Sequence, residues 1–202
     1  SEHGHGHDHD REHGHAHDHD HAHGAPGGHH HRGPAEIAQI IDGAAMTDGA
    51  KAIAHRMFGF VADAEARAHG VPVGEVHFHE VGAVDSIADI IAIAVAADDL
   101  APDGVIVSDL PCGYGTVRCQ HGLIPVPAPA TAFIAEAAGL TLSPVDVEGE
   151  LVTPTGAAAA AALRTEAALP ERFSIKAIGM GAGKRAYDTP GILRAMIIEP
   201  AE

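Results

Sequence analysis

The sequence predicts a mixed α/β fold, a single domain preceded by a disordered histidine-rich segment, and three observations lead to this class. Helical and extended patterns alternate along residues 34–202. The composition changes sharply near residue 33, after a tract without Leu, Ile, Val, Phe or Met. Aromatic residues are few, with no Trp, two Tyr and five Phe, so aliphatic residues and alanine must build the core.

Helical spacing of apolar residues dominates the first half of the domain. We expect a short helix over 35–42 and a long one that begins at Thr47 or Asp48 and stops at Gly70. After a short extended segment at 76–79, a buried, alanine-rich helix over 87–100 begins at Asp85 or Ser86.

The second half mixes strands, helices and turns. The expected elements are a strand at 105–110, a Gly/Pro-rich loop at 111–130, a helix at 131–138 ended by Gly139, a polyalanine helix at 156–168, and strands at 174–178 and 192–198 around a glycine-rich turn at 179–183.

Charge and composition exclude several function classes. With 12 Lys+Arg against 28 Asp+Glu, the net charge of −16 disfavours binding to nucleic acid or to an anionic membrane. The two cysteines are too few for a disulfide scaffold and fit a reducing compartment. No run of 18 apolar residues occurs, and the start has no apolar signal-peptide region, so we expect a cytoplasmic protein.

Residues 1–33 form the histidine-rich segment, with 13 of the 18 histidines. The segment has too little apolar surface to offset the entropy of ordering, so we expect it to be disordered. Its imidazoles and aspartates suit Ni²⁺, Cu²⁺, Zn²⁺ and Co²⁺ without selecting among them. Storage or delivery of metal fits better than catalysis. A spacer is the alternative, and a purification tag is disfavoured because the histidines alternate with Gly, Ala and Asp.

His77 and His79 share one face of the extended segment, while Val76 and Phe78 occupy the other. Two imidazoles on one face make half of a metal site. Further along, Asp85 and Asp89 share a helix face and could complete a nitrogen and oxygen ligand set. The alternatives are that Asp85 caps the helix and Asp89 pairs with an arginine.

His121, in the loop after Cys119, could be a third imidazole or a polar contact to substrate, with a solvent-facing loop histidine as the default. Cys112 and Cys119 are seven positions apart, which is not a standard zinc spacing. A thiolate would still suit nickel or the handling of substrate sulfur, with ordinary loop cysteines as the default.

Two glycine-containing motifs could bind phosphate. Thr153, Thr155 and Gly156 open the polyalanine helix, where free N–H groups and the helix dipole favour an anion, although N-capping explains the same residues. Gly181 and Gly183, followed by Lys184, could let the backbone approach a substrate, a weaker signal that is not a Walker A loop.

Four blocks together resemble the LarC family of nickel-insertion proteins. They are VHFHEVGAVDSIADI, HGLIPVPAPAT, ELVTPTGAA and GMGAG…LRA, in the family's order over roughly residues 36–198. The resemblance implies a cyclometallase that inserts Ni²⁺ into pyridinium-3,5-bisthiocarboxylic acid mononucleotide. The product is the nickel-pincer nucleotide cofactor of lactate racemase, and the family consumes CTP with Mn²⁺ or Mg²⁺.

Under this resemblance, Ni²⁺ is a substrate, held or relayed by His77, His79, Glu80, Asp85, Asp89 and His121. Glu80 could act as the general base that takes the proton displaced from the pyridinium ring. The bound phosphate would be that of the mononucleotide. An opening block like DCFSGISGDM and the family's CTP-binding C-terminal domain are missing. We therefore expect the central part of the N-terminal half, working with a separate nucleotide-binding chain and forming a homo-oligomer.

Two other functions compete with nickel insertion. The first is a non-catalytic nickel-binding, storage or delivery protein that acts through its histidine-rich segment. The second is a metal-dependent hydrolase built on the same ligands, which would turn over simple phosphate esters. No G-x-S-x-G motif supports nucleophilic serine chemistry.

Overall fold

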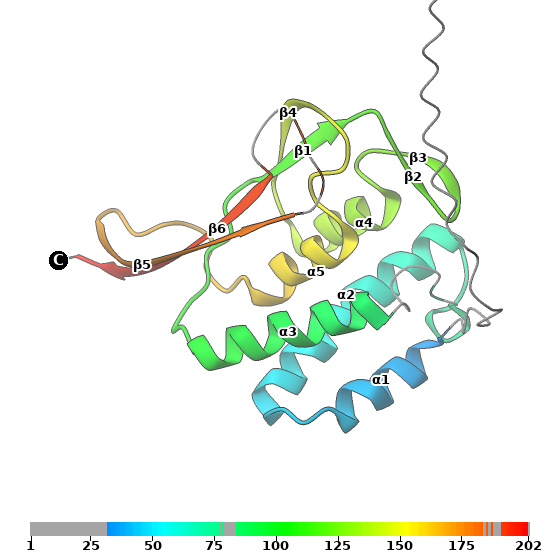
Figure 1. Ribbon diagram of the computed structural model, residues 1–202, viewed down its shortest axis with the longest axis horizontal. Coiled ribbons are helices and arrows are strands. Elements are labelled where there is room, and N and C mark those ends of the chain that lie inside the picture. The colour runs from blue at the N-terminus through cyan, green and yellow to red at the C-terminus, as the bar shows by residue number, and fades with distance from the viewer. Residues whose placement is uncertain are drawn as a thin grey trace, which may run out of the picture. The chain divides into compact units, whose positions relative to one another are not determined.

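The computed structural model describes residues 32–76, 78, 84–183, 185, 187 and 191–201. These residues belong to one compact unit, His31–Glu202, in which helices and strands alternate, so the mixed α/β class is confirmed (Figure 1). The elements are α1 Pro34–Gly43, α2 Asp48–His69, a 3-10 turn η1 at Val73–Glu75, α3 Val84–Leu100, β1 Leu110–Tyr114, β2 Thr116–Cys119, β3 Gly122–Pro125, α4 Pro129–Ala138, β4 Leu142–Glu148, α5 Pro154–Leu163, β5 Phe173–Ala182 and β6 Ile192–Pro200. None of the helices in these ranges is long and apolar enough to cross a lipid bilayer.

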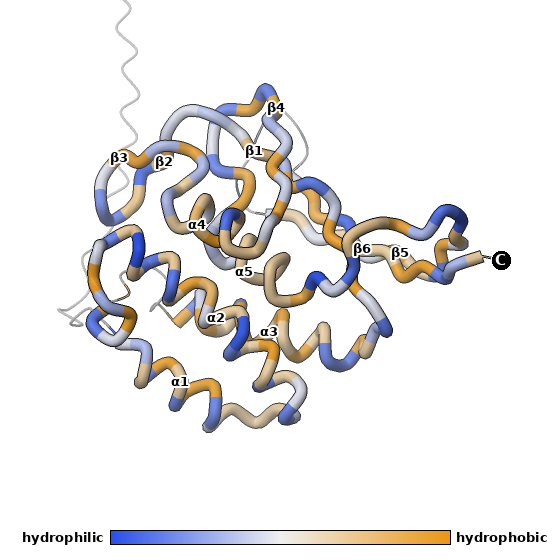
Figure 2. The backbone as a smooth tube through the Cα atoms, turned by 180° about the vertical axis from the view of Figure 1, so that it is seen from behind, coloured by the Kyte–Doolittle hydropathy of each residue, from blue (hydrophilic) through white to orange (hydrophobic). Residues whose placement is uncertain are grey.

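Helix α2 lies at the centre of the fold and packs against α1, α3, α4 and α5. Its boundaries are those predicted: the Thr47 hydroxyl accepts a hydrogen bond from the Ala50 N–H at 3.1 Å, and Gly70 ends the helix with a φ of 66°. Apolar and polar residues alternate along α1 and α2, as expected for helices with one buried face (Figure 2). The predicted helices at 35–42 and 131–138 are also confirmed, as α1 and α4.

The buried core consists mainly of small and branched aliphatic side chains contributed by α1, α2, α3, α4 and α5. Its largest fully buried members are Ile37, Ile41, Met57, Ile90, Ile134, Val61, Val76 and Thr131. Alanines of α2 and α5 fill the remaining space, so these two helices approach closely. The prediction of an aliphatic and alanine core is confirmed.

Three small sheets complete the described part of the chain. β1 pairs with β4 in parallel, β2 with β3 antiparallel, and β5 with β6 antiparallel. The first two involve the region predicted as a Gly/Pro-rich loop, and that prediction was wrong. Gly115 and Gly122, with φ values of 87° and 95°, provide turns that let the short strands pair.

The predicted strand at 105–110 was also wrong, because β1 begins only at Leu110. Strand β4 was not predicted at all. Within 105–109 the backbone forms only an isolated bridge, between Ile106 and Glu166. The Val105 carbonyl accepts hydrogen bonds from the N–H groups of Thr165 and Glu166, at 2.9 and 3.0 Å. These hydrogen bonds also explain why α5 ends at Leu163 rather than at the predicted residue 168. The backbone N–H groups of Thr165 and Glu166 bind the Val105 carbonyl instead of continuing the helix.

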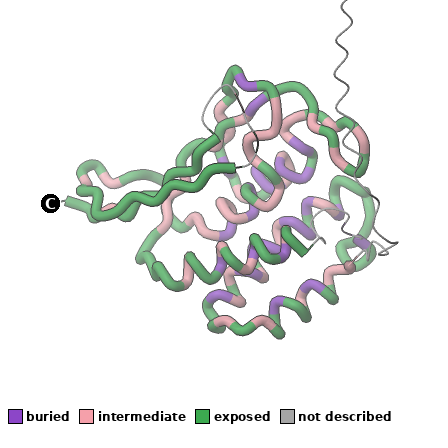
Figure 3. Tube along the Cα trace, in the orientation of Figure 1, coloured by how far each residue is buried: buried purple, intermediate pink, exposed green. Residues whose placement is uncertain are grey.

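Two further expectations need correction. Helix α3 buries only Ile87, Ile90 and Ala94, because it covers one side of α2 and leaves its other face to solvent. The glycine-rich segment at 179–183 is not a turn: residues 179–182 continue β5 and pair with β6. Pairing with β6 holds these small residues extended, and Figure 3 shows the two-stranded β5–β6 ribbon almost entirely exposed.

The histidine-rich segment predicted for residues 1–33 lies outside the described residues, except for its last two. Arg32 and Gly33 belong to the folded unit, where the Gly33 carbonyl accepts the N–H groups of Glu36 and Ile37 at the start of α1.

Candidate functional site

The histidine pair predicted as half of a metal site, His77 and His79, lies outside the described residues, as does Glu80. Their apolar neighbours are described: Val76 is 2% exposed and Phe78 is 3% exposed. Both side chains therefore face the core. The part of the predicted alternation that concerns these two residues is confirmed.

Phe78 is fixed by contacts to two parts of the fold. Its ring packs edge-on against Phe58 of α2, with centroids 5.2 Å apart. Its backbone N–H donates a hydrogen bond to the Arg32 carbonyl at 3.3 Å. The residue between the two histidines is thus held in place by α2 and by the residues just before α1.

Asp85 and Asp89 both lie in the first half of α3 and are exposed. Within the described ranges, neither carboxylate has a hydrogen-bond or ion-pair partner, so neither the helix-capping explanation nor the arginine pair is seen there. They remain predicted ligands.

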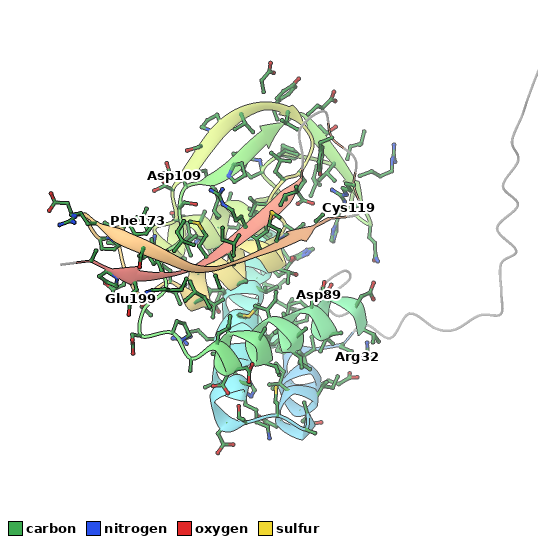
Figure 4. The ribbon with its side chains drawn as sticks, turned by 60° about the vertical axis from the view of Figure 1, so that its left-hand side comes forward. Arg32, Asp89, Asp109, Cys119, Phe173 and Glu199 are labelled. Carbon is green, nitrogen blue, oxygen red and sulfur yellow. The ribbon has the colours of Figure 1, made fainter. Side chains whose placement is uncertain are left out.

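His121 lies in the turn between β2 and β3, two residues after Cys119, which is labelled in Figure 4. Its backbone N–H donates to the Cys119 Sγ at 3.4 Å, and its ring Nδ1 lies 3.8 Å from the same sulfur. Its ring also contacts that of His69, at the end of α2, with centroids 5.0 Å apart and planes tilted by 53°. His121 is thus exposed to solvent and also contacts Cys119 and His69.

The fold adds a carboxylate to this group. Glu65 lies one helical turn before His69, and its Oε2 is 3.5 Å from the His69 Nε2. The Glu65 side chain is only 18% exposed. We call Glu65, His69, Cys119 and His121 the α2–hairpin cluster, since α2 supplies two residues and the β2–β3 hairpin two.

Glu65 and His69 were not predicted from the sequence as site residues. The signal that could have found them is their spacing of four residues on one helix face, but this spacing does not show that the hairpin lies opposite. In the described part of the chain, no three His, Cys, Asp or Glu side chains already converge as a closed metal site.

The second cysteine, Cys112, lies in β1, and its thiol donates to the Gly113 carbonyl at 3.4 Å. Cys112 and Cys119 are both free cysteines. Cys112 has no described histidine contact, so it serves as a natural comparison for Cys119.

The predicted phosphate site at the start of α5 has the geometry of an N-cap. The Thr153 hydroxyl accepts the Gly156 N–H at 3.2 Å, and Pro154 has no N–H to offer. Thr155, the second residue of α5, has a backbone N–H that points toward the N-terminal end of the helix, where an anion would bind. Capping is therefore present, and phosphate binding remains a prediction.

The other predicted substrate-binding glycines lie at the open end of β5. Gly181 pairs with Leu193, and the Gly183 N–H donates to the Gly191 carbonyl at 3.3 Å. A methyl group added at either glycine would contact nothing within 4 Å, so the fold itself does not require glycine there. Lys184 lies outside the described residues.

Beyond these glycines, the chain contacts the loop before α5. Arg185 forms an ion pair with Glu150 at 3.5 Å, and the Tyr187 hydroxyl donates to the Glu150 carbonyl at 2.7 Å. Arg185 and Tyr187 are thereby tied to the loop that leads to Thr153.

Comparisons with known proteins show the class to which this fold and these residues belong. The profile of the nickel insertion protein family matches residues 7–202, and the chain belongs to this family. A pyridinium-3,5-bisthiocarboxylic acid mononucleotide nickel insertion protein from Alkaliphilus metalliredigens is 52% identical over 174 residues, which is 86% of this chain and 41% of the relative. A protein of the same name from Akkermansia muciniphila is 45% identical, over 89% of this chain and 44% of its own length.

The family resemblance seen in the sequence is thus confirmed, and the relatives extend to a putative nickel insertion protein of Geotalea daltonii, 47% identical over 85% of the chain. The chain spans less than half the length of the curated relatives it matches. No solved structure matches the chain.

Proposed function

We propose that this chain handles nickel in the metalation of pyridinium-3,5-bisthiocarboxylic acid mononucleotide, the reaction that forms the nickel-pincer nucleotide cofactor. The observation that carries the proposal is the family match over residues 7–202, together with relatives named for this reaction at 40–52% identity. In this proposal the reaction is that of a CTP-dependent nickel-inserting lyase in the cytoplasm. CTP and its Mn²⁺ or Mg²⁺ would be held by a separate nucleotide-binding domain or chain.

The chemistry assigns roles to the predicted residues. Nickel is borderline in softness and accepts both imidazole and sulfur, so a histidine-bound ion can pass to the two thiocarboxylate sulfurs of the substrate. Formation of the carbon–nickel bond replaces a ring proton, which needs a carboxylate base close to the ring. We assign nickel binding to His77, His79, Asp89 and His121, proton transfer to Glu80 and Asp85, contact with the substrate phosphate to Thr153, Thr155 and Gly156, and substrate contact to Gly181 and Gly183.

The histidine-rich segment would act as a reservoir in this scheme. Its 13 imidazoles are similar ligands for several divalent metals, so they raise the local concentration of nickel without selecting it over the other metals. The acidic net charge of −16 favours divalent cations in the same way.

The direct test is cofactor formation by the purified chain with substrate, Ni²⁺ and CTP, with and without the remaining portion of a full-length relative supplied as a second chain. We expect the nickel-pincer product, detected by mass spectrometry, when both chains are present. Nickel binding without product in either mixture would instead support the storage or delivery function. Hydrolysis of simple phosphate esters without the pincer substrate would support the hydrolase.

The histidine pair provides a residue-level prediction. Replacing His77 and His79 together by Ala should lower cofactor yield at least tenfold, because two of the four proposed nitrogen and oxygen ligands are lost. The matched control is His55→Ala, since the His55 ring pairs with Asp42 at 2.7 Å and His55 is not a proposed ligand. Wild-type cofactor yield from the double variant would remove these residues from the site.

A further inference from the structure

We infer that the α2–hairpin cluster is a binding site for a divalent transition-metal cation, with His69, Cys119 and His121 as ligands and Glu65 as the residue that orients His69. The inference goes beyond the ligands assigned above, which included only His121 from this group. It rests on the proposed function for the identity of the metal as nickel, but the site is argued from geometry alone.

Two distances within the cluster match those between neighbouring ligands of one ion. A nitrogen and a sulfur bound to one tetrahedral ion at about 2.1 and 2.3 Å lie about 3.6 Å apart. The His121 Nδ1 and the Cys119 Sγ are 3.8 Å apart. The two atoms therefore already have the spacing of neighbouring ligands.

The second imidazole also fits this arrangement. Two imidazoles on one tetrahedral ion place their ring centroids about 5.2 Å apart, since each centroid lies about 3.2 Å from the metal. The His69 and His121 centroids are 5.0 Å apart, with a tilt of 53° that rules out flat stacking. One ion between the rings would then have two nitrogen ligands and one sulfur ligand.

Glu65 supplies the support that metal-bound histidines usually have. A ligating imidazole commonly donates its other ring N–H to a carboxylate, which fixes the ring and raises its basicity. Glu65 Oε2 lies 3.5 Å from the His69 Nε2. In the proposed site the metal therefore binds the other ring nitrogen, Nδ1. The low exposure of the Glu65 side chain, 18%, strengthens this interaction.

The three proposed ligands do not yet meet at one point in the described structure. Closing the site takes a ring rotation at His69 or His121, and both have room for it because His69 is 33% exposed and His121 is exposed. Binding also releases the Cys119 thiol proton to solvent. Three protein ligands leave a fourth position open to water or to a substrate sulfur, the arrangement expected of a site that passes its metal on.

The test uses Co²⁺ as an optical probe in the full chain. Only Cys112 and Cys119 can give a thiolate-to-cobalt charge-transfer band, because the chain has two cysteines and the histidine-rich segment has none. We expect one equivalent of Co²⁺ to produce this band and Ni²⁺ to displace the Co²⁺. Cys119→Ser should abolish the band, and Cys112→Ser, the matched control, should leave it intact.

The other cluster residues separate a site from a lone reactive thiol. His69→Ala and His121→Ala should each weaken the band-forming Co²⁺ affinity at least tenfold, Glu65→Gln should weaken it by about tenfold, and His55→Ala should not change it. Unfolding curves of each variant check that the fold is retained. If Cys119→Ser unfolds, the two histidine variants decide the question.

Absence of the band in the wild-type chain, its loss in Cys112→Ser, or unchanged affinity in both histidine variants would overturn the inference. The outcome is independent of cofactor formation. If the charge-transfer band forms but no cofactor is made, the metal site is supported and the proposed function is contradicted. If cofactor is made but no band forms, the proposed function is supported and the metal site is contradicted.

Discussion

Gly113 of β1 is the residue whose side chain the fold excludes most sharply. A methyl group there would lie 2.2 Å from the Gly149 carbonyl oxygen and 2.7 Å from that of Val147, both backbone atoms that cannot move aside independently. Gly113→Ala should therefore separate β1 from β4 and lower the free energy of unfolding by about 2 kcal/mol or more, measured by urea denaturation.

The matched control for this substitution is Gly59→Ala. Gly59 lies in α2, where an added methyl group meets nothing within 4 Å, so alanine should raise stability by about 0.5–1 kcal/mol through helix propensity. Equal effects of the two substitutions would contradict the crowding described at Gly113.

Single residues also show which members of the candidate site a sequence can point to. His121 was recognisable as a candidate ligand because it follows a cysteine in a glycine-containing turn. His69 was not, because its only local feature is a glutamate one turn earlier. The proximity of His69 to His121 arises from the packing of the β2–β3 hairpin against the end of α2, across 52 residues of sequence separation (121 minus 69).

At the scale of elements, the start of α2 joins two helices. The Thr47 hydroxyl accepts the Ala50 N–H at 3.1 Å and donates to the Asp98 Oδ2 of α3 at 2.6 Å. Thr47→Ala removes both bonds and should lower the free energy of unfolding by about 1 kcal/mol, as for other lost helix caps. Thr47→Ser keeps the hydroxyl, so its free energy of unfolding should stay close to that of the wild type. Thermal unfolding of the two variants and the wild type measures both effects. A serine variant as unstable as the alanine variant would show that the methyl group matters instead of the hydrogen bonds.

The elements differ in how well their sequences predicted them. α1, α2 and α4 were predicted because each carries local signals: apolar periodicity, a capping residue or a terminal glycine. β4 was missed because it contains Pro144 and pairs with the distant strand β1. The β2–β3 hairpin was missed because its strands are only four residues long and lie in a stretch rich in Gly and Pro. The end of α5 was misplaced because Thr165 and Glu166 bind Val105 rather than extend the helix.

At the scale of the whole molecule, the β5–β6 ribbon projects from the helices with many large apolar side chains exposed (Figures 1 and 3). These residues are Ile175, Ile178, Met180, Ile192, Leu193, Met196 and Ile197. An isolated two-stranded ribbon is marginally stable in water, and an apolar one favours a covering partner. This surface is where we expect the predicted homo-oligomer to form, through a second copy of the chain.

The oligomer prediction can be tested at the two most exposed of these residues. Leu193 is 78% exposed and Met180 is 74% exposed. Replacing either residue by Lys should shift the chain toward the monomer, as measured by sedimentation velocity. Leu123→Lys is the control, since Leu123 is 61% exposed on β3, away from the ribbon. A wild-type chain that sediments as a monomer would contradict self-association and leave the ribbon for the portion of the longer relatives that this chain does not span.

Local sequence patterns were sufficient for the family, the class of fold, the helices that carry caps and periodicity, and the aliphatic nature of the core. These properties depend on neighbouring residues or on whole motifs, which a linear sequence displays directly. The pairing of β1 with β4, the end of α5, and the meeting of Glu65 and His69 with Cys119 and His121 emerged from the folded chain alone. They depend on contacts between distant segments, whose free energy is set by packing and shared hydrogen bonds rather than by any local preference.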